Sequence, residues 1–452
     1  MPIRFRWRDF LAPSQILRLH ATLARTEWMP PAQRAVFCNR LLAKTIRHAY
    51  ERVPHWRDLF DRHHLKPSDI RTPADLAKLP IMERSVLAGS GDRLLARGVR
   101  VRATTHTSGT TGQIVTVHHD RRTNALEFVY YWRYWGWAGY RLGDHFGQVV
   151  NAPLLGAPLA CDRPLVRWEP LVRRLLINAQ AVQRETAHRI ADALHRYRLR
   201  FLKGVVTGVY ALARAFDLAG VEAPPFQAVF STGAPVPPAW RALISRTFHA
   251  PVIDSYGLME RCAAISQCPA GGYHVHEEYG ALELTDVRLR EPFGRALGTA
   301  VGTTLHNFVM PLIRYNTGDL IEPAPPGAVC PCGRTLPLVA GILGRHEHFV
   351  LTPSGRVVQG LLSLRAHVPG LEFGQYIQEG PERLVARVCC GPGYTPTSDA
   401  MLRAIIRRLT GGEMHIEIER VEFERLERTA VGKVAEVIAR DVPHPSQQSQ
   451  NL

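Results

Sequence analysis

Residues 106–113 read "HTSGTTGQ", a composition suited to holding phosphate oxygens. Glycines let successive backbone N–H groups converge on an anion, and the serine and threonine hydroxyls add further donors. A nucleotide-binding P-loop carries a lysine directly after its last glycine, whereas this chain has Gln113 there. The stretch therefore predicts either a polar turn or a phosphate cradle whose positive charge comes from another part of the chain.

Two further segments carry side chains that bind metals. "QCPAGGYHVHEE" contains Cys268 and His274, and "CPCGR" contains Cys330 and Cys332. Three thiolates and one imidazole are a sufficient tetrahedral set for a structural zinc ion, although Cys-x-Cys is tighter than the usual spacing. His276 is an equally good imidazole ligand, and four unconnected residues are the alternative.

Length and charge limit the function classes. A chain of 452 residues exceeds what one hydrophobic core serves and predicts two or three domains. It has no run of about 18 apolar residues and no apolar signal segment, so we expect a cytoplasmic protein without a membrane span. The net charge of +16 indicates an anionic partner. No nucleic-acid-binding motif is present, which disfavours nucleic acid.

Strands and helices alternate around these residues. β-branched runs flank the Gly/Ser/Thr stretch, so we expect it to join two strands. An aromatic-rich helix is predicted from Arg121 to Tyr140. After it, short apolar runs such as "FQAVFSTG" alternate with helical segments such as "PPAWRALISRTF". This alternation is typical of a mostly parallel sheet, whose ligands bind at loops after the carboxyl ends of strands.

The pattern changes along the chain and predicts its division. Apolar positions have helical spacing in a lead-in over residues 1–80, and the chain becomes more β-like from residue 280 to 320. Short strands and a helix begin again after "GILGR". We place a domain boundary near Arg345, which gives an N-terminal domain of residues 1–344, a C-terminal domain of residues 345–440 and a disordered tail at residues 441–452.

Six motifs in order carry a family resemblance. "TSGTTG" is followed by "STGAPV", "DSYGLMER", "MPLIRYNTGDL", "GR" at residues 344–345 and "RTAVGK". Together they resemble the adenylate-forming enzymes, that is, acyl-CoA synthetases, adenylation domains and luciferases, and most closely the phenylacetate-coenzyme A ligases and their capsule-biosynthesis-type relatives. The resemblance implies an α/β fold, with a large N-terminal domain of mixed sheets and helices and a small α+β C-terminal lid domain.

The resemblance also implies roles for single residues. Glu260 would help to hold Mg²⁺, Asp319 would accept hydrogen bonds from the ribose hydroxyls of ATP, and Lys433 would bridge the substrate carboxylate and the α-phosphate. The implied catalytic residues are Lys433, Glu260 and Thr110, and Glu347 is the implied hinge. The implied ATP-binding residues are Thr107, Ser108, Gly109, Thr110, Thr111, Gly112, Gly233, Ala234, Pro235, Ser255, Tyr256, Gly257, Asp319 and Arg345.

The resemblance favours an aromatic carboxylic acid as substrate. Tyr131, Trp132 and Trp135 on the aromatic helix are the candidates for its pocket, although aromatics at helical spacing also form cores. The acyl acceptor would be coenzyme A or an acyl carrier protein, and the basic surface leans toward the acidic carrier protein.

The chain departs from the family pattern at three places, and the last two, at the hinge and the glycine-rich stretch, favour an alternative. Gln113 and Ile114 replace the usual Lys and Pro, and Glu347 and His348 stand where two acidic residues are usual. The glycine-rich stretch that normally follows is replaced by "TPSGRVVQG". The alternative is a non-catalytic or adenylation-only nucleotide-binding relative.

Overall fold

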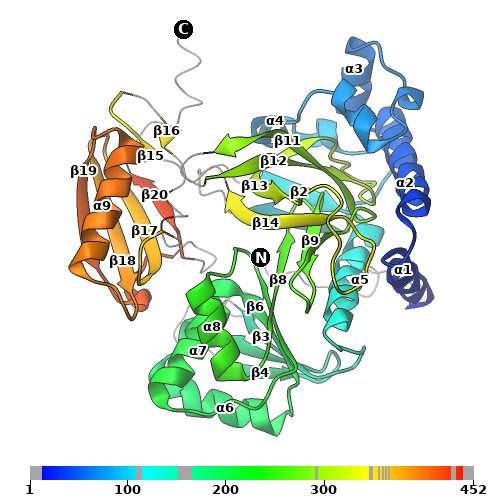
Figure 1. Ribbon diagram of the computed structural model, residues 1–452. Helices are drawn as coiled ribbons and strands as arrows, with labels where there is room; N and C mark the ends of the chain where they lie inside the picture. Colours follow the sequence, from blue (N-terminus) through cyan, green and yellow to red (C-terminus); the bar gives the residue numbers. More distant parts are fainter. Residues whose placement is uncertain are drawn as a thin grey trace.

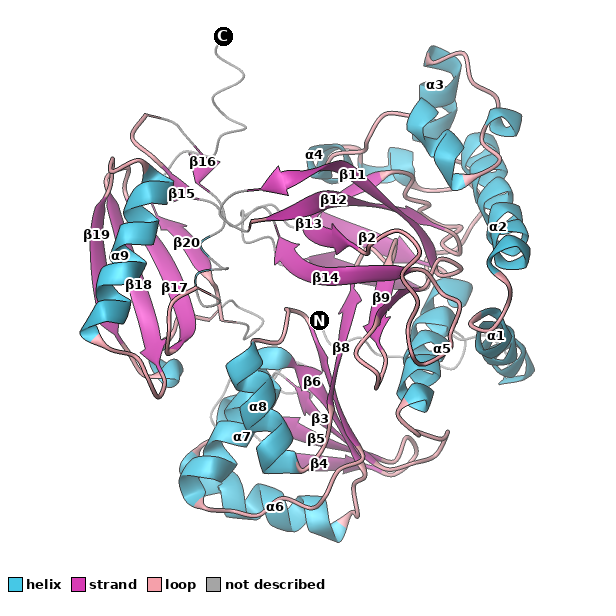
Figure 2. Cartoon of the chain, viewed as in Figure 1, coloured by secondary structure: helices cyan, strands magenta, loops and turns pink. Residues whose placement is uncertain are grey.

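A twelve-stranded sheet and a separate four-stranded sheet organise the computed structural model (Figure 1). The structure describes residues 13–107, 115–150, 165–290, 294–345, 350–354, 357–358, 361, 364, 367–428 and 434–440. The large sheet combines an antiparallel half with a mostly parallel half (Figure 2). This mixed architecture with a smaller C-terminal sheet confirms the predicted fold class.

The strand order of the large sheet puts the two halves side by side at β8 and β9. The antiparallel half is β11 (Gly280–Arg290), β12 (Arg295–Thr304), β13 (Tyr315–Pro323), β14 (Leu338–Arg345), β10 (Tyr273–Val275) and β9 (Ala264–Gln267). The mostly parallel half is β8 (Val252–Gly257), β7 (Ala228–Thr232), β6 (Phe201–Val205), β3 (Phe146–Val150), β5 (Arg174–Asn178) and the antiparallel edge strand β4 (Val166–Glu169).

Helices cover both faces of the parallel half. Alternate residues of each strand point to opposite faces. Phe201 therefore packs with α5 (Arg121–Trp137), and Leu202 packs with the helices on the other face. These are α6 (Ala187–Arg196), α7 (Val206–Ala219) and α8 (Pro238–Phe248). Asp120 caps α5, because its Oδ1 accepts from the Thr123 backbone N–H at 2.8 Å. The predicted aromatic helix is thus confirmed, and it ends at Trp137.

The N-terminal region is helical, as predicted, and leads to a hairpin. Its helices are α1 (Pro13–Thr26), α2 (Pro31–Arg52), α3 (Pro54–Arg62) and α4 (Arg84–Gly89), and the hairpin is β1 (Ala103–Thr107) and β2 (Val115–His119). Antiparallel pairing of Thr107 with Val115 confirms that the Gly/Ser/Thr stretch connects two strands. None of the helices in the described ranges is long and apolar enough to span a bilayer.

The C-terminal sheet docks against α7 and α8 through aromatic rings. It consists of β19 (His415–Arg420), β18 (Arg383–Cys390), β17 (Leu371–Glu379) and β20 (Val437–Arg440), with α9 (Pro396–Thr410) against it. The short pair β15 (Val350–Leu351) and β16 (Val357–Val358) precedes it. Trp240 of α8 stacks on Phe373 of β17 with centroids 5.3 Å apart, and Tyr210 of α7 donates a 3.0 Å hydrogen bond to Glu372. β14 ends at Arg345, where the domain boundary is predicted.

Gly280 tests how tightly the antiparallel half packs. A Cβ built on Gly280 would lie 2.1 Å from the carbonyl oxygen of Cys262, and a backbone atom cannot move aside like a side chain. We expect Gly280→Ala to lower the free energy of unfolding by about 1–3 kcal/mol, measured by urea denaturation. Gly89→Ala is the matched control, since a Cβ at that position would have no atom within 4 Å. Equal stability of the two variants would contradict this packing.

Candidate functional site

The carboxyl ends of β7 and β8 carry two of the predicted nucleotide segments. Gly233 follows β7 in the left-handed region, with φ 88°, which opens the turn toward α8. Tyr256 lies one residue before the end of β8, and its Oη donates a 2.7 Å hydrogen bond to Oδ2 of Asp319 on β13. Two motifs that are 63 residues apart therefore meet in one polar contact.

Arg345 and the Ala-Pro turn reach the same place. Asp319 pairs with Arg345 across β13 and β14. The neighbouring Gly344 lies against the turn after β7, because a Cβ built on it would be 3.7 Å from Cδ of Pro235. The structure thus brings together the backbone of four segments. The sequence predicts that these segments contact the adenine and the ribose of ATP or form the hinge.

The Tyr256–Asp319 contact shows that the large sheet curls back on itself. The order β8-β9-β10-β14-β13 puts four strand-to-strand steps between the two residues. In a flat sheet these steps would separate the strands by roughly 19 Å, at about 4.8 Å each. The contact therefore requires the antiparallel half to roll over an apolar interior. This interior contains Ile265, Val275, Ala300, Ile321 and Val339.

Asp319 is an unusual carboxylate because it is 4% exposed. Its backbone N–H donates to Oγ1 of Thr317 at 3.1 Å, which fixes the strand around it. Burial, and next to it the Asp319 charge, raise the pKa of Tyr256 well above its usual value, so the phenol stays a donor. A carboxylate has two acceptor oxygens, which suits two vicinal hydroxyls of a ribose.

The carboxylate of Glu260 has one oxygen that accepts a hydrogen bond and one that has no hydrogen-bond partner among the described residues. Its Oε1 accepts from Tyr315 Oη at 3.0 Å and lies 3.8 Å from Nη1 of Arg84. Oε2 is buried without a hydrogen-bond partner among the described residues. A buried carboxylate oxygen normally has a hydrogen bond or a cation, so this atom fits the predicted Mg²⁺ ligand.

The hairpin of the Gly/Ser/Thr stretch adjoins the Glu260 turn. Thr105 Oγ1 on β1 donates to the carbonyl oxygen of Met259 at 3.3 Å. Thr107 ends β1 two residues later. Several predicted residues lie outside the described ranges: Ser108, Gly109, Thr110, Thr111, Gly112, Gln113, Ile114, Glu347, His348, Lys433 and the tail at 441–452. Val434, which follows Lys433, is buried in the cluster that contains Trp240 and Phe373.

Two curated relatives match the chain in sequence, whereas no family model matches it. A phenylacetate-coenzyme A ligase from Aromatoleum evansii is 27% identical over 326 residues, which cover 68% of this chain and 69% of that enzyme. A phenylacetate-coenzyme A ligase from Thermus thermophilus is 25% identical over 334 residues, covering 72% of this chain and 73% of that enzyme. The chain is a relative of the adenylate-forming enzymes.

Solved structures show that this relationship includes the fold of the whole chain. A 2-hydroxyisobutyryl-CoA ligase in the postadenylation state has a TM-score of 0.67 at 18% identity, and covers 99% of this chain and 97% of its own. The same enzyme in the thioesterification state has a TM-score of 0.58 at 19% identity, with coverages of 99% and 98%. The chain therefore has the adenylate-forming fold in both its large and its small part.

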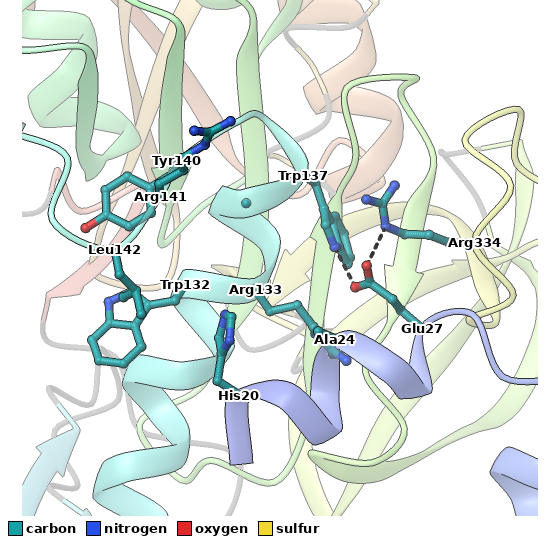
Figure 3. Close-up of a pocket in the computed structure, with 11 residues that line it drawn as sticks. His20, Ala24, Glu27, Trp132, Arg133, Trp137, Tyr140, Arg141, Leu142 and Arg334 are labelled. Carbon is teal, nitrogen blue, oxygen red and sulfur yellow. Dashed lines mark hydrogen bonds and ion pairs between the residues drawn. The ribbon is translucent and has the colours of Figure 1, made fainter. Parts of the chain in front are cut away.

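The three aromatic residues predicted for the acyl pocket have different surroundings. Trp135 is buried, and its ring stacks on Phe230 at 5.1 Å and 15°, as a core residue does. Tyr131 faces Lys203 of β6. Trp132 instead lines a cavity of about 380 Å³ between α1 and the end of α5 (Figure 3). The helix thus presents its rings to three environments.

The cavity in Figure 3 lies toward the amino ends of the parallel strands. Tyr140, which lines it, contacts Phe146 and Phe201, the first residues of β3 and β6. Its polar lining includes Glu27, which accepts from Trp137 Nε1 at 2.7 Å, and the arginines Arg133, Arg141 and Arg334. The nucleotide segments lie at the carboxyl ends of the same sheet, so Trp132 is on the far side from them.

The predicted metal ligands converge. One ligand atom from each of Cys268, His274, Cys330 and Cys332 lies within 4.8 Å of the others. A Cβ built on Gly272 would lie 2.6 Å from Sγ of Cys330, so only glycine leaves room for this cluster. Burial lowers the pKa of His274 to about 4, which leaves a neutral imidazole able to act as a ligand.

His276, the other candidate imidazole, faces a different neighbour. Its Nδ1 contacts the guanidinium of Arg133 on α5, and its ring stacks on Trp137. Arg133 also pairs with Glu278, which is fully buried. His276 is thus part of a polar network, and His274 is the imidazole of the cluster.

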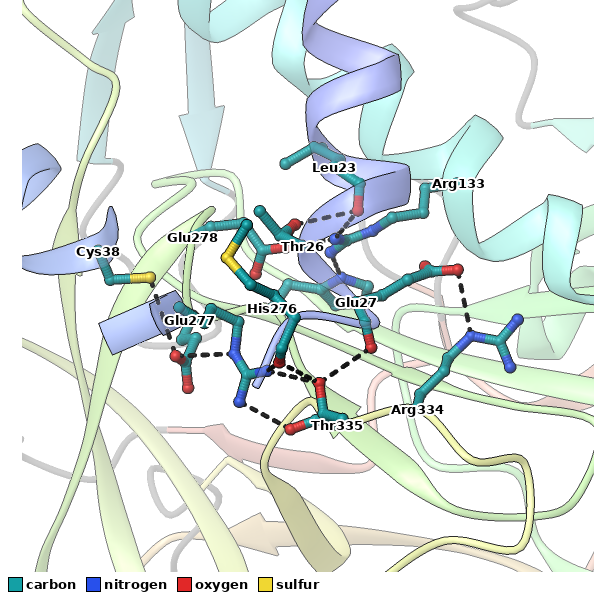
Figure 4. A network of polar contacts seen from close by, with 12 residues as sticks. Leu23, Thr26, Glu27, Cys38, Arg133, His276, Glu277, Glu278, Arg334 and Thr335 are labelled. Atoms are coloured by element: carbon teal, nitrogen blue, oxygen red, sulfur yellow. Dashed lines mark hydrogen bonds and ion pairs between the residues drawn. The ribbon is translucent and has the colours of Figure 1, made fainter. Parts of the chain in front are cut away.

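The loop that carries two of the thiols is fastened to the N-terminal helices (Figure 4). Arg34 of α2 donates to both Oγ1 and the carbonyl oxygen of Thr335 at 2.7 Å, and pairs with Glu277 at 3.0 Å. Arg334 lies 3.5 Å from Glu27. The helical lead-in therefore holds the cysteine loop against β10 and β14.

Sequence reasoning missed Asp254, which lies next to the predicted nucleotide segments. Asp254 precedes the Ser255–Tyr256 pair and is 4% exposed, with its Oδ2 accepting from Tyr273 Oη at 3.1 Å. Ser255 was predicted to bind ATP, but its hydroxyl donates to the carbonyl oxygen of Ser231 at 3.0 Å and accepts from Tyr134. Asp254 is the first residue of the "DSYGLMER" motif, so its charge was a usable signal.

Asp254 predicts a pH dependence of stability. Burial, opposed by the Tyr273 hydrogen bond, raises the pKa of Asp254 to about 6. Between about pH 4 and 6 the unfolded chain releases this proton while the folded chain keeps it, so rising pH lowers stability, and the loss is complete above pH 6. We expect wild type to lose roughly 2–3 kcal/mol relative to Asp254→Asn between pH 4 and 7 in urea titrations. A stability difference between the two proteins that does not change with pH would contradict this.

Proposed function

We propose that the protein activates a small aromatic carboxylic acid with ATP and passes the acyl group to a pantetheine thiol. The meeting of Tyr256 and Asp319 beside the turn at Gly233 carries this proposal, because it places a buried two-oxygen acceptor at the carboxyl ends of the parallel strands. The phenylacetate-coenzyme A ligases among its relatives support an aromatic acid.

In the first half-reaction, an oxygen of the substrate carboxylate attacks the α-phosphorus of ATP and the bond to pyrophosphate breaks. Asp319 holds the ribose hydroxyls, the Gly233–Pro235 turn lies along the adenine, and Lys433 neutralises the carboxylate and the α-phosphate as they approach. Glu260 would hold Mg²⁺ through Oε2, and that ion would offset the charge of the phosphates. The Gly/Ser/Thr stretch supplies donors to the outer phosphates.

In the second half-reaction, a thiol sulfur attacks the acyl carbon and AMP leaves. We infer that the C-terminal domain, from Arg345 onward, moves between the two steps and carries Lys433 with it. The net charge of +16 supports an acidic acyl carrier protein as acceptor, and coenzyme A is the other pantetheine thiol of this chemistry. Product masses from a mixture of both acceptors distinguish them.

Acid-dependent exchange of pyrophosphate into ATP tests the first half-reaction. With a panel of aromatic acids, we expect Asp319→Asn to raise the KM for ATP by about 10- to 100-fold, because a charged acceptor of two hydroxyls is weakened. Lys433→Ala should lower kcat by roughly 10²- to 10³-fold. The exposed Lys66→Ala serves as the control and should behave as wild type.

Two results would contradict the proposal. One is exchange with Lys433→Ala at the wild-type rate. The other is ATP binding by wild type without exchange for any acid, which would identify a non-catalytic nucleotide-binding relative.

We also propose that Cys268, His274, Cys330 and Cys332 hold a structural zinc ion. The four donors match the preferred Cys₃His set, and the glycine at position 272 leaves space beside Cys330. The cluster joins β9 and β10 to the loop before β14, so its role is to fasten chain segments.

Metal analysis of the purified protein tests the zinc site. We expect about one zinc per chain, and Cys330→Ser should lower both the zinc content and the Tm. Cys390→Ser is the matched control, since Cys390 is exposed on β18 and lies outside the cluster. Wild-type protein that contains no zinc after expression with added zinc would overturn the assignment.

A further inference from the structure

Lys203 places an ammonium group within the parallel half of the large sheet. It lies on β6 between β3 and β7, and its Nζ is 3.6 Å from the ring centroid of Tyr131 and 5.1 Å from that of Trp135. Burial, opposed by the charge of Glu127, lowers the pKa of its ammonium to about 8. A half-buried lysine on an internal strand is normally paired with a carboxylate.

The described part of the chain gives Lys203 aromatic faces but neither an ion pair nor a hydrogen bond. Oε2 of Glu127 accepts from Tyr279 Oη at 2.6 Å instead. Gln148 is opposite Lys203 on β3, and its Oε1 accepts from Arg174 at 2.9 Å. Oε2 of Glu127 and Oε1 of Gln148 therefore each accept a hydrogen bond from another donor.

Several cations gather on this face of the sheet. Arg174 and Arg167 both pair with the carboxylate of Glu169, at 2.5 and 2.8 Å. Lys203 adds a further cation, and its side chain is partly exposed although its strand is internal to the sheet. An anion or another oxygen acceptor is the ligand that this surface favours.

Lys203 lies close to the edge where the nucleotide segments meet. Val205, Thr232 and Ser255 form one row across the carboxyl ends of β6, β7 and β8. Lys203 is two residues before this row, or roughly 7 Å at about 3.3 Å per residue. Its contact with Tyr131 puts it on the α5 side. The distance from Lys203 to the row at the carboxyl edge is therefore about the length of one aromatic ring with its substituents.

We propose that Lys203 forms the inner end of the acyl site and selects acids that carry a second oxygen acceptor, a carboxylate or a phenolic hydroxyl, remote from the reacting carboxylate. The inference rests on the proposed function, because adenylation puts the reacting carboxylate at the carboxyl edge of the sheet. Tyr131 and Trp135 hold the ammonium from one side, and the substrate group binds its remaining N–H donors. Lys203 is thus the specificity-determining residue.

Pyrophosphate exchange with matched acids tests this selection. Benzoates and phenylacetates that carry 4-methyl, 4-hydroxy or 4-carboxy groups have similar shapes but differ at the remote end. We expect wild type to show a kcat/KM about 10- to 100-fold higher for the oxygen-bearing acids than for the methyl acids. Comparison of the 4-hydroxy acids with the 4-carboxy acids shows which acceptor group the enzyme prefers.

Variants at position 203 separate selection from folding. Lys203→Met should lower kcat/KM for the oxygen-bearing acids about 10- to 100-fold more than for the methyl acids, and Lys203→Arg should retain the preference. Wild type that favours the methyl acids, or Lys203→Met that lowers all acids equally, would overturn the proposal. Exchange with no acid at all would instead refute the proposed function, and the preference of wild type is measurable even where a variant does not fold.

Discussion

The hydrogen bond from Tyr256 to Asp319 is the constraint on which the arrangement of the site depends. It joins the parallel half of the large sheet to the antiparallel half, although four strand steps separate the two residues in sheet order. The sheet can satisfy it only by rolling over its apolar interior. Because the sheet rolls in this way, the turn after β7, the end of β8 and the β13–β14 pair come together at one edge of the sheet. Each of these segments by itself is only the end of a strand.

The polar groups around this edge gain their chemistry from burial. Glu260 has a buried carboxylate oxygen without a partner among the described residues, and Lys203 has a half-buried ammonium with aromatic neighbours. Leaving such groups unpaired costs free energy that the surrounding packing must offset, and that cost is removed when a ligand supplies the missing partner. The cysteine–histidine cluster lies at the opposite ends of β9 and β14, where Arg34 binds the loop that carries two of its thiols.

The sequence predicted those parts of the site that are local in the chain. Short motifs with glycines and acids predicted the nucleotide segments, and the hairpin at Thr107 and Val115 followed from β-branched runs on either side of the Gly/Ser/Thr stretch. The cluster of Cys268, His274, Cys330 and Cys332 was predicted because thiols and an imidazole are rare donors. The features that the sequence could not predict depend on packing between residues that are distant in the chain. Trp132 and Trp135 have similar helical spacing, yet one lines a cavity and the other is core. Lys203 stood out only once β3, β6 and α5 were assembled around it.

A crystal structure of the protein with bound ATP tests the central claim most directly. The account predicts that both ribose hydroxyls lie within hydrogen-bond distance of the Asp319 carboxylate, with the adenine along the Gly233–Pro235 turn. A nucleotide bound elsewhere, with the Tyr256–Asp319 pair remote from it, would contradict the account.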